Sequence, residues 1–178
     1  MKFAVIGSNF VADWFIEAGK RCEGFELYAI YSRTMERAKE YAAQHGAPVC
    51  YTSLEELEND PAVEAVYLAS HTYCHVQQAV SLMKAGKHVL CEKPMGFNER
   101  EVSQMIGTAK EHHVTLLEAM RSDYSPAFLA VQKGLCKLGP LRRASLRFCQ
   151  YSSRYDKFKN GIIENAFRPE IAGGAIMD

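Results

Sequence analysis

The sequence predicts an α/β protein built on a doubly wound parallel sheet, followed by the beginning of an α+β domain with an antiparallel sheet. Short apolar runs alternate with helical stretches from the first residue, which is the pattern of consecutive βαβ units. A glycine-containing turn follows the first apolar run, at Gly7, and the alternation ends near residue 120. Together these observations indicate a Rossmann domain at the N-terminus.

Six apolar runs account for the expected strands of the parallel sheet. They are residues 2–6, 25–31, 49–51, 63–69, 88–92 and 114–118. Helices are expected between them, with Thr34, Ser53 and Asn98 as N-caps, because these side chains accept hydrogen bonds from the first-turn N–H groups. Gly86 is suited to end the helix that starts near Cys74, since glycine readily adopts a positive φ.

The pattern and composition of the sequence change after residue 120, which indicates a second domain. Residues 122–138 have the pattern of a helix. Residues 141–155 are rich in arginine, serine and aromatic side chains and partly alternate, which favours a strand of an antiparallel sheet with one wet face. We therefore assign residues 1–120 to the Rossmann domain and residues 121–178 to the incomplete start of a C-terminal domain.

Composition and charge narrow the class of protein. Lys and Arg total 21, as do Asp and Glu, so the chain lacks the basic surplus that binds nucleic acids or anionic membranes. No apolar run approaches the ~18 residues of a membrane span, and no cleavage site follows the apolar start. The six cysteines form no C-x-x-C pair, which favours reduced thiols. We expect a cytoplasmic protein that binds small molecules, without nucleic-acid or membrane partners.

The turn after the first strand occupies the place of a dinucleotide-binding loop. In the G-x-G-x-x-G/A fingerprint, the glycines make a tight turn and let the backbone approach a pyrophosphate. Gly7 and Ala12 fit this pattern, whereas Asn9 replaces a glycine; asparagine tolerates positive φ, so the turn survives if its side chain points away from the phosphates. Such turns also occur in α/β proteins that bind no nucleotide. The expected cofactor contacts are Gly7, Ser8, Asn9, Phe10 and Val11.

The end of the second strand bears on the choice of cofactor. An acidic residue about 20 positions beyond the glycines normally holds the ribose hydroxyls, whereas an arginine accommodates a 2′-phosphate. Here the chain reads Ser32-Arg33-Thr34, without an acid. Because a hydroxyl and a guanidinium suit a phosphate, Ser32 and Arg33 favour NADP, with NAD as the alternative. The other interpretation of Arg33 is a solvated residue ahead of a helix.

The segment Cys91-Glu92-Lys93-Pro94 is the most specific motif in the chain. A strand that ends in this way places Lys93 at the carboxyl edge of a parallel sheet, where ligands bind. With the Gly7 loop, this segment resembles the Gfo/Idh/MocA family of oxidoreductases. Further matches in the family's order are residues 69–75, 85–94, 118–119 and 172–178.

The resemblance implies that Lys93 lies beside the nicotinamide and the substrate, so that Glu92 and Lys93 belong to the cofactor site. A positioned lysine can donate a hydrogen bond to a developing alkoxide, which gives Lys93 a catalytic role. The resemblance also implies that Gly173 and Gly174 open a segment in which Asp178 assists proton transfer, and that full-length relatives are homo-oligomers. The other interpretation of Lys93 is an exposed loop residue.

The residues after the fourth strand depart from the family's usual Thr-Pro-Asn. This chain has Ser70-His71-Thr72, with His75 where a histidine is common in the family. The hydroxyls of Ser70 and Thr72 suit the ribose and phosphates of a cofactor. His71 and His75 have the spacing of a metal pair but lack a third ligand, so they are better interpreted as polar lining and a first-turn residue. The expected contacts are Ser70, His71, Thr72 and His75, and no metal is expected.

Two functions remain open at this stage. The first is an NAD(P)-dependent oxidoreductase that transfers a hydride between nicotinamide and a sugar-like or cyclic polyol or carbonyl substrate, present as an N-terminal portion that lacks full activity. The second is a non-catalytic NAD(P)-binding fragment or regulator. A coding continuation beyond Asp178 with a histidine or tyrosine one turn later would favour the first.

Overall fold

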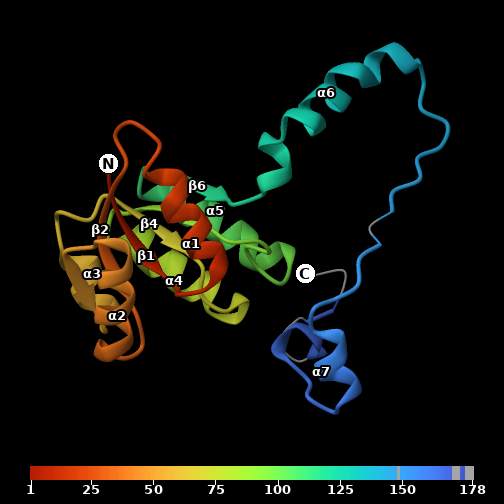
Figure 1. The fold of residues 1–178 in the computed structure, drawn as a ribbon. Helices are drawn as coiled ribbons and strands as arrows, with labels where there is room; N and C mark the ends of the chain where they lie inside the picture. The colour runs from red at the N-terminus through yellow and green to blue at the C-terminus, as the bar shows by residue number, and fades with distance from the viewer. Residues whose placement is uncertain (148, 170–172, 175–178) are drawn as a thin grey trace. The chain divides into compact units, whose positions relative to one another are not determined.

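Six parallel strands form one sheet in the order β3-β2-β1-β4-β5-β6 in the computed structural model (Figure 1). The order confirms the predicted doubly wound Rossmann sheet. The strand bounds are β1 Lys2–Ile6, β2 Glu26–Tyr31, β3 Val49–Tyr51, β4 Ala65–Leu68, β5 His88–Cys91 and β6 Leu116–Glu118. The first and third strands have the expected bounds, and the other four are shorter at one or both ends.

The structure describes residues 1–147, 149–169 and 173–174. They form two compact units, Met1–Ala119 and Met120–Asp178. The sheet lies wholly within the first unit.

Three helices of the first unit, α2, α3 and α5, begin at the capping residues that the sequence predicts. Thr34, Ser53 and Asn98 each accept a hydrogen bond from the backbone N–H three residues later, and Gly86 has a φ of 79°. The helix bounds are α1 Phe10–Gly19, α2 Met35–His45, α3 Leu54–Asn59, α4 Thr72–Lys84 and α5 Glu99–Glu111.

The core is divided between the two faces of the sheet because successive strand residues point to opposite sides. In β4, Val66 and Leu68 pack with residues of α3, α4 and α5, whereas Tyr67 packs with residues of α1 and α2. Helices therefore cover both faces, as Figure 1 shows. This arrangement leaves the carboxyl edge of the sheet to loops.

The second unit contains short helices and, among its described residues, no strand. Their bounds are η1 Arg121–Tyr124, α6 Pro126–Leu135, η2 Cys136–Leu138, α7 Tyr155–Lys159 and η3 Asn165–Phe167. The helix expected over residues 122–138 is therefore interrupted at Ser125, whose backbone is extended. None of the residues of this unit whose exposure the structure describes is buried.

The strand expected over residues 141–155 is wrong for the described residues of that range. They have no strand structure, and a helix begins at Tyr155. A strand needs a partner to satisfy its backbone N–H and C=O groups, and the described part of the second unit offers no second strand.

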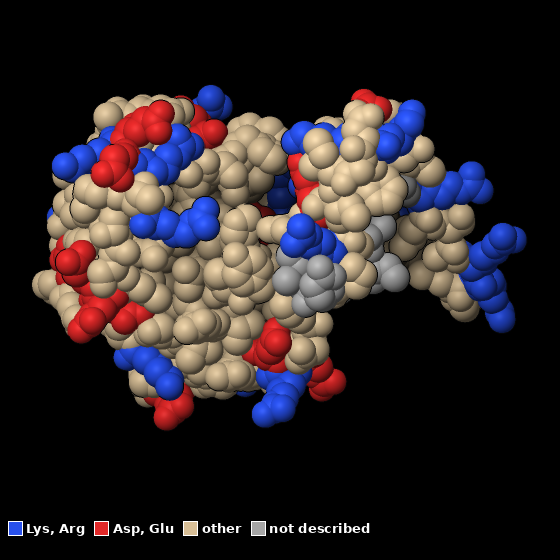
Figure 2. All heavy atoms as spheres, turned by 90° about the horizontal axis from the view of Figure 1, so that it is seen from below, with Lys and Arg blue, Asp and Glu red and all other residues tan. Residues whose placement is uncertain are grey.

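Surface charge agrees with the balanced composition. On the face seen in Figure 2, acidic and basic side chains are scattered among uncharged residues. Within the described ranges, no helix has the length and apolarity that a membrane crossing requires.

Candidate dinucleotide site

Four loops that carry the predicted site residues follow adjacent strands at one edge of the sheet. They contain Gly7–Asn9 after β1, Ser32–Arg33 after β2, Ser70–Thr72 after β4 and Glu92–Lys93 after β5. Because the strands are parallel and neighbours in the order β2-β1-β4-β5, their carboxyl ends meet at this edge. The strand order reverses between β1 and β4, which is where ligands bind in open α/β sheets.

Gly7 has no room for a side chain. Its φ is 116°, and a Cβ built on it would lie 2.4 Å from the backbone oxygen of Ala69. The loop after β1 therefore packs directly against the loop after β4, and only glycine permits that approach.

Asn9 caps helix α1 and does not adopt the positive φ that its place in the fingerprint suggests. Its φ is −114°, and its Oδ1 accepts hydrogen bonds from the N–H groups of Val11 and Ala12 at 3.1 and 3.0 Å. Its Nδ2 donates to the oxygen of Ala69 at 3.1 Å. The side chain thus satisfies two first-turn donors and ties the loop after β1 to the loop after β4.

Arg37 is a residue of this site that the sequence interpretation missed. From the first turns of α2 it reaches back to the glycine loop, where Nε donates to Ser8 Oγ at 3.1 Å and a terminal nitrogen donates to Ser8 O at 3.3 Å. Its other terminal nitrogen pairs with Glu40 at 2.7 Å. Arg33 is exposed just before the same helix. Its place in the first turn of the helix that follows Arg33 is a signal that could have identified Arg37.

A partly buried network of Asp13, Tyr41 and His45 joins α1 to α2. Asp13 Oδ1 accepts a hydrogen bond from Tyr41 at 2.6 Å and lies 2.9 Å from His45 Nε2. Burial, followed by the hydrogen bond to Asp13, raises the pKa of Tyr41 above its usual range. The hydroxyl therefore stays protonated and fixes the helix that carries Arg37.

The Lys93 turn, residues Glu92–Met95, has hydrogen bonds to its backbone from several elements. Glu92 Oε1 accepts from Tyr67 at 2.5 Å, and Glu92 Oε2 accepts from the N–H of Lys93 at 3.2 Å. The Lys93–Pro94 peptide bond is cis. Burial, followed by the bond to Glu92, raises the pKa of Tyr67 above its usual range, so its hydroxyl is a donor. Tyr67 gave no local signal in the sequence beyond its apolar strand.

The predicted residues after β4 have different surroundings. Ser70 Oγ donates to Gln78 Oε1 at 2.6 Å, and Thr72 is the first residue of α4. His71 is exposed and stacks on Tyr73, with ring centroids 5.5 Å apart.

His75 is buried, and both of its ring nitrogens face carbonyl oxygens. With His71 exposed, the two histidines do not form a chelating pair. In the parts of the chain that the structure describes, no group of three or more potential metal ligands occurs.

The remaining predicted site residue, Asp178, belongs to the second unit. Asp178 lies outside the described residues, while Gly173 and Gly174 of the same motif are described, Gly174 with a φ of 127°.

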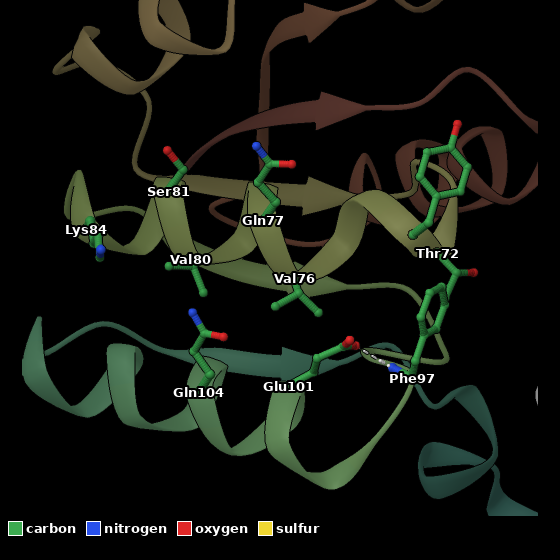
Figure 3. Close-up of a pocket in the computed structure, with 10 residues that line it drawn as sticks. Thr72, Val76, Gln77, Val80, Ser81, Lys84, Phe97, Glu101 and Gln104 are labelled. Atoms are coloured by element: carbon green, nitrogen blue, oxygen red, sulfur yellow. Dashed lines mark hydrogen bonds between the residues drawn. The ribbon is translucent and has the colours of Figure 1, made fainter. Parts of the chain in front are cut away.

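A groove of about 520 Å³ runs between α4 and α5, with Thr72 as its one predicted site residue (Figure 3). Gln77 and Ser81 of α4 and Gln104 of α5 line it, and no residue of the glycine loop does.

The comparisons with known proteins agree with this fold. A family model described as an oxidoreductase family with an NAD-binding Rossmann fold, Gfo/Idh/MocA, matches residues 1–120. The chain is 46% identical over 178 residues to a scyllo-inositol 2-dehydrogenase (NADP(+)) of Bacillus subtilis, covering 100% of this chain and 54% of that protein. It is 36% identical over 156 residues to the human trans-1,2-dihydrobenzene-1,2-diol dehydrogenase, covering 86% of this chain and 44% of that protein. The chain thus spans about half the length of the curated relatives it matches.

Solved structures show the same fold. An NAD binding oxidoreductase from Klebsiella pneumoniae superimposes with a TM-score of 0.71 and 29% identity, over 77% of this chain and 38% of that one. A 3-ketoreductase from Actinomadura kijaniata, solved in complex with NADP and TDP-benzene, has a TM-score of 0.71 and 27% identity, over 77% of this chain and 42% of that one.

Proposed function

Because the chain belongs to the Gfo/Idh/MocA oxidoreductase family, we propose that it is the N-terminal portion of an NAD(P)-dependent oxidoreductase acting on CH–OH groups. Its substrate would be a sugar-like or cyclic polyol, or the corresponding carbonyl compound. Relatives named for inositol and for a dihydrodiol support this substrate class. Residues 1–120 would bind the cofactor, and residues 121–178 would begin the substrate domain.

The observation that carries the proposal is the meeting of four loops at the point where the strand order reverses. Gly7 approaches the oxygen of Ala69 so closely that the loops after β1 and β4 pack directly against each other. The dinucleotide would lie along this edge of the sheet, held by residues of the four loops. These are Gly7, Ser8, Asn9, Phe10, Val11, Ser32, Arg33, Ser70, His71, Thr72, Glu92 and Lys93, with the buried His75 supporting the site from behind them. A site built in this way positions a cofactor across the sheet edge.

The adenosine end favours NADP over NAD. No carboxylate follows β2, and Ser32 and Arg33 offer a hydroxyl and a guanidinium to a 2′-phosphate. Arg37, bonded to Ser8, adds a second guanidinium at the same corner. The name of the Bacillus subtilis relative specifies NADP, which supports this choice.

At the other end, Lys93 would act on the reacting oxygen. The cofactor supplies a nicotinamide carbon that exchanges hydride with the substrate carbon. Lys93 would donate a hydrogen bond to the oxygen on that carbon, stabilising negative charge as it develops there. Asp178 would help to move the hydroxyl proton, in concert with residues of a longer chain.

Nicotinamide absorbance measured for two proteins in parallel tests the proposal. One protein is this chain, and the other is this chain joined to the remaining substrate domain of a family member; both are given sugars, inositols and their oxidised forms. We expect turnover from the extended protein only, because a general base contributes ~10²–10⁴-fold and substrate positioning adds further. In the extended protein, Lys93→Met should lower kcat more than it weakens cofactor binding.

The second candidate function makes a different forecast in the same experiment. A non-catalytic NAD(P)-binding fragment or regulator would bind the cofactor and show no turnover even when extended. Robust turnover by the 178-residue chain alone would contradict the proposal that turnover requires the remaining substrate domain.

A further inference from the structure

We propose that Tyr67, His75 and Glu118 are positioning residues for Lys93, which they serve by fixing the backbone on both sides of it. The inference rests on the proposed function, since it assumes that Lys93 acts beside a nicotinamide. It adds three residues on separate elements to the machinery of that site.

The first contact fixes the backbone ahead of Lys93. Tyr67 lies in β4, is 2% exposed and stacks on Phe15 of α1 with ring centroids 3.9 Å apart. Its hydroxyl donates to one oxygen of Glu92, and the other oxygen of that carboxylate accepts the Lys93 N–H. The carboxylate is therefore held at one end and holds the Lys93 backbone at the other. Charge-assisted bonds of this kind are the stronger class of hydrogen bond.

The second contact fixes the backbone after Lys93. His75 of α4 is 1% exposed, with Nδ1 at 3.0 Å from Pro94 O and Nε2 at 3.1 Å from Ser70 O. The ring thus spans the loop after β4 and the Lys93 turn. A neutral imidazole carries one N–H and donates to one of the two carbonyls, whereas the doubly protonated ring donates to both.

The third contact comes from β6, on the far side of β5. Glu118 Oε1 accepts the N–H of Met95 at 2.9 Å. The Lys93 turn is thus held from β4, α4 and β6, so it is supported on both flanks of the strand that precedes it.

Burial separates two of these residues, Tyr67 and His75, from direct contact with a ligand, and the third, Glu118, is half-buried. Tyr67 and His75 are almost fully enclosed, and their polar atoms already have partners in the protein. Their effect on a cofactor must therefore pass through the Lys93 turn. A group that acts only there should affect the nicotinamide end of the dinucleotide and leave the adenosine end at Ser32 and Arg33 unchanged.

This difference between the two ends is the basis of the test. NADPH reports both ends, and its nicotinamide fluorescence reports the surroundings of the reacting ring. The fragment 2′-phospho-ADP-ribose reports the adenosine end alone. Each is titrated against the unmodified chain and against Tyr67→Phe, His75→Phe and Glu118→Ala.

We expect each variant to bind NADPH about tenfold more weakly and to lose most of the fluorescence change on binding, while its affinity for the fragment stays within twofold. Glu118→Gln keeps an acceptor oxygen and should restore the behaviour of the unmodified chain. Tyr51→Phe is the matched control, because it also removes a tyrosine hydroxyl bonded to a carboxylate, that of Asp60, which precedes β4 and lies away from the Lys93 turn. It should keep the NADPH fluorescence change.

Other outcomes distinguish a failure of the proposed dinucleotide site from a failure of the positioning role. If the unmodified chain binds neither ligand, the proposed dinucleotide site is wrong. If it binds both and the variants weaken both in parallel, or weaken neither, the positioning role is overturned while the site stands. An NADPH complex of the unmodified chain without any fluorescence change would also overturn it, because the nicotinamide would then not lie in a fixed environment at Lys93.

Discussion

The two ends of strands β4 and β5 use polar side chains in different ways. Asp60 precedes β4 and Lys87 precedes β5, and with Tyr51 of β3 they form the Asp60 cluster. Lys87 is 6% exposed and donates to Asp60 O at 2.6 Å, while the Asp60 carboxylate accepts from the hydroxyl of Tyr51. These groups join the segment before β4 to the segment before β5 and to β3. They stabilise the packing of these segments against the sheet.

Beyond the ends of the same strands, the polar side chains bind the backbone of loops. Asn9, His75 and Glu118 each bond to main-chain atoms of a loop at the carboxyl edge. These bonds fix the backbone of a loop, and so the position of the side chains on that loop. Polar side chains with hydrogen-bond partners therefore stabilise the fold in one region and define a binding surface in the other.

Gly7→Ala should have the largest effect and should affect both stability and binding. The new Cβ would meet the oxygen of Ala69 at 2.4 Å in a backbone conformation that strains any side chain. We expect unfolding in urea to show a loss of about 3 kcal/mol and NADPH titration to show no saturation. Gly46→Ala is the control, since it has a similar positive φ with nothing within 4 Å, and should cost only about 1 kcal/mol. Equal losses for the two variants would show that the contact with Ala69 does not matter.

Lys87→Ala should lower stability without affecting the cofactor. The variant loses a hydrogen bond from a buried ammonium and the packing of its stem, together worth about 2–3 kcal/mol. Chemical denaturation measures the loss, with exposed Lys84→Ala as the control, expected within about 0.5 kcal/mol of the parent. A fall in NADPH affinity beyond twofold would break the distinction between the two ends.

Arg33→Ala should have the opposite profile. Fluorescence titration should show the preference for NADPH over NADH reduced roughly tenfold to a hundredfold, because a charged hydrogen bond contributes about 1.5–3 kcal/mol. Stability should change little, since Arg33 is exposed. Equal affinities for NADPH and NADH in the unmodified chain would contradict the assignment of this corner.

Tyr51→Phe should have the smallest effect and should depend on pH. The hydroxyl of Tyr51, followed by the N–H of Ala62, lowers the pKa of Asp60 below its usual value. A lowered carboxyl pKa adds stability above the ordinary pKa, and that stability is lost as the pH falls through the lowered one. At pH 7 we expect the variant to be about 1 kcal/mol less stable, with the difference shrinking below about pH 4. A difference that stays constant down to pH 2 would show that the hydroxyl does not interact with the ionised carboxylate.

Local chemistry explains which features the sequence predicts. The N-caps at Thr34, Ser53 and Asn98 depend on contacts three residues away, and Gly7 depends on a turn between two adjacent elements. The parallel order follows from the alternation of strands and helices. For these reasons the sheet and the four loops at its edge are apparent from the sequence.

The missed features depend on partners far away in the chain. Tyr67 and Glu118 are important through contacts with the Lys93 turn. Tyr67 bonds to Glu92, 25 residues away in the chain, and Glu118 bonds to Met95, 23 residues away. Asn9 adopts a capping conformation instead of a positive φ because Ala69 O, 60 residues on, offers its amide a partner. The strand expected over residues 141–155 failed for a related reason, because its pattern gives no information about a partner strand.

The exposure of apolar side chains in the second unit also affects how molecules of the chain interact with one another in solution. Large apolar side chains there are well exposed, with Leu146 at 95%, Tyr124 at 70% and Leu138 at 68%. Apolar surface in contact with water attracts other apolar surface, so two molecules of the chain attract each other at short range. With a formal net charge of zero, no long-range repulsion opposes that attraction. Light scattering should therefore give a negative second virial coefficient near neutral pH, and the solubility limit should rise when the pH is moved away from neutrality.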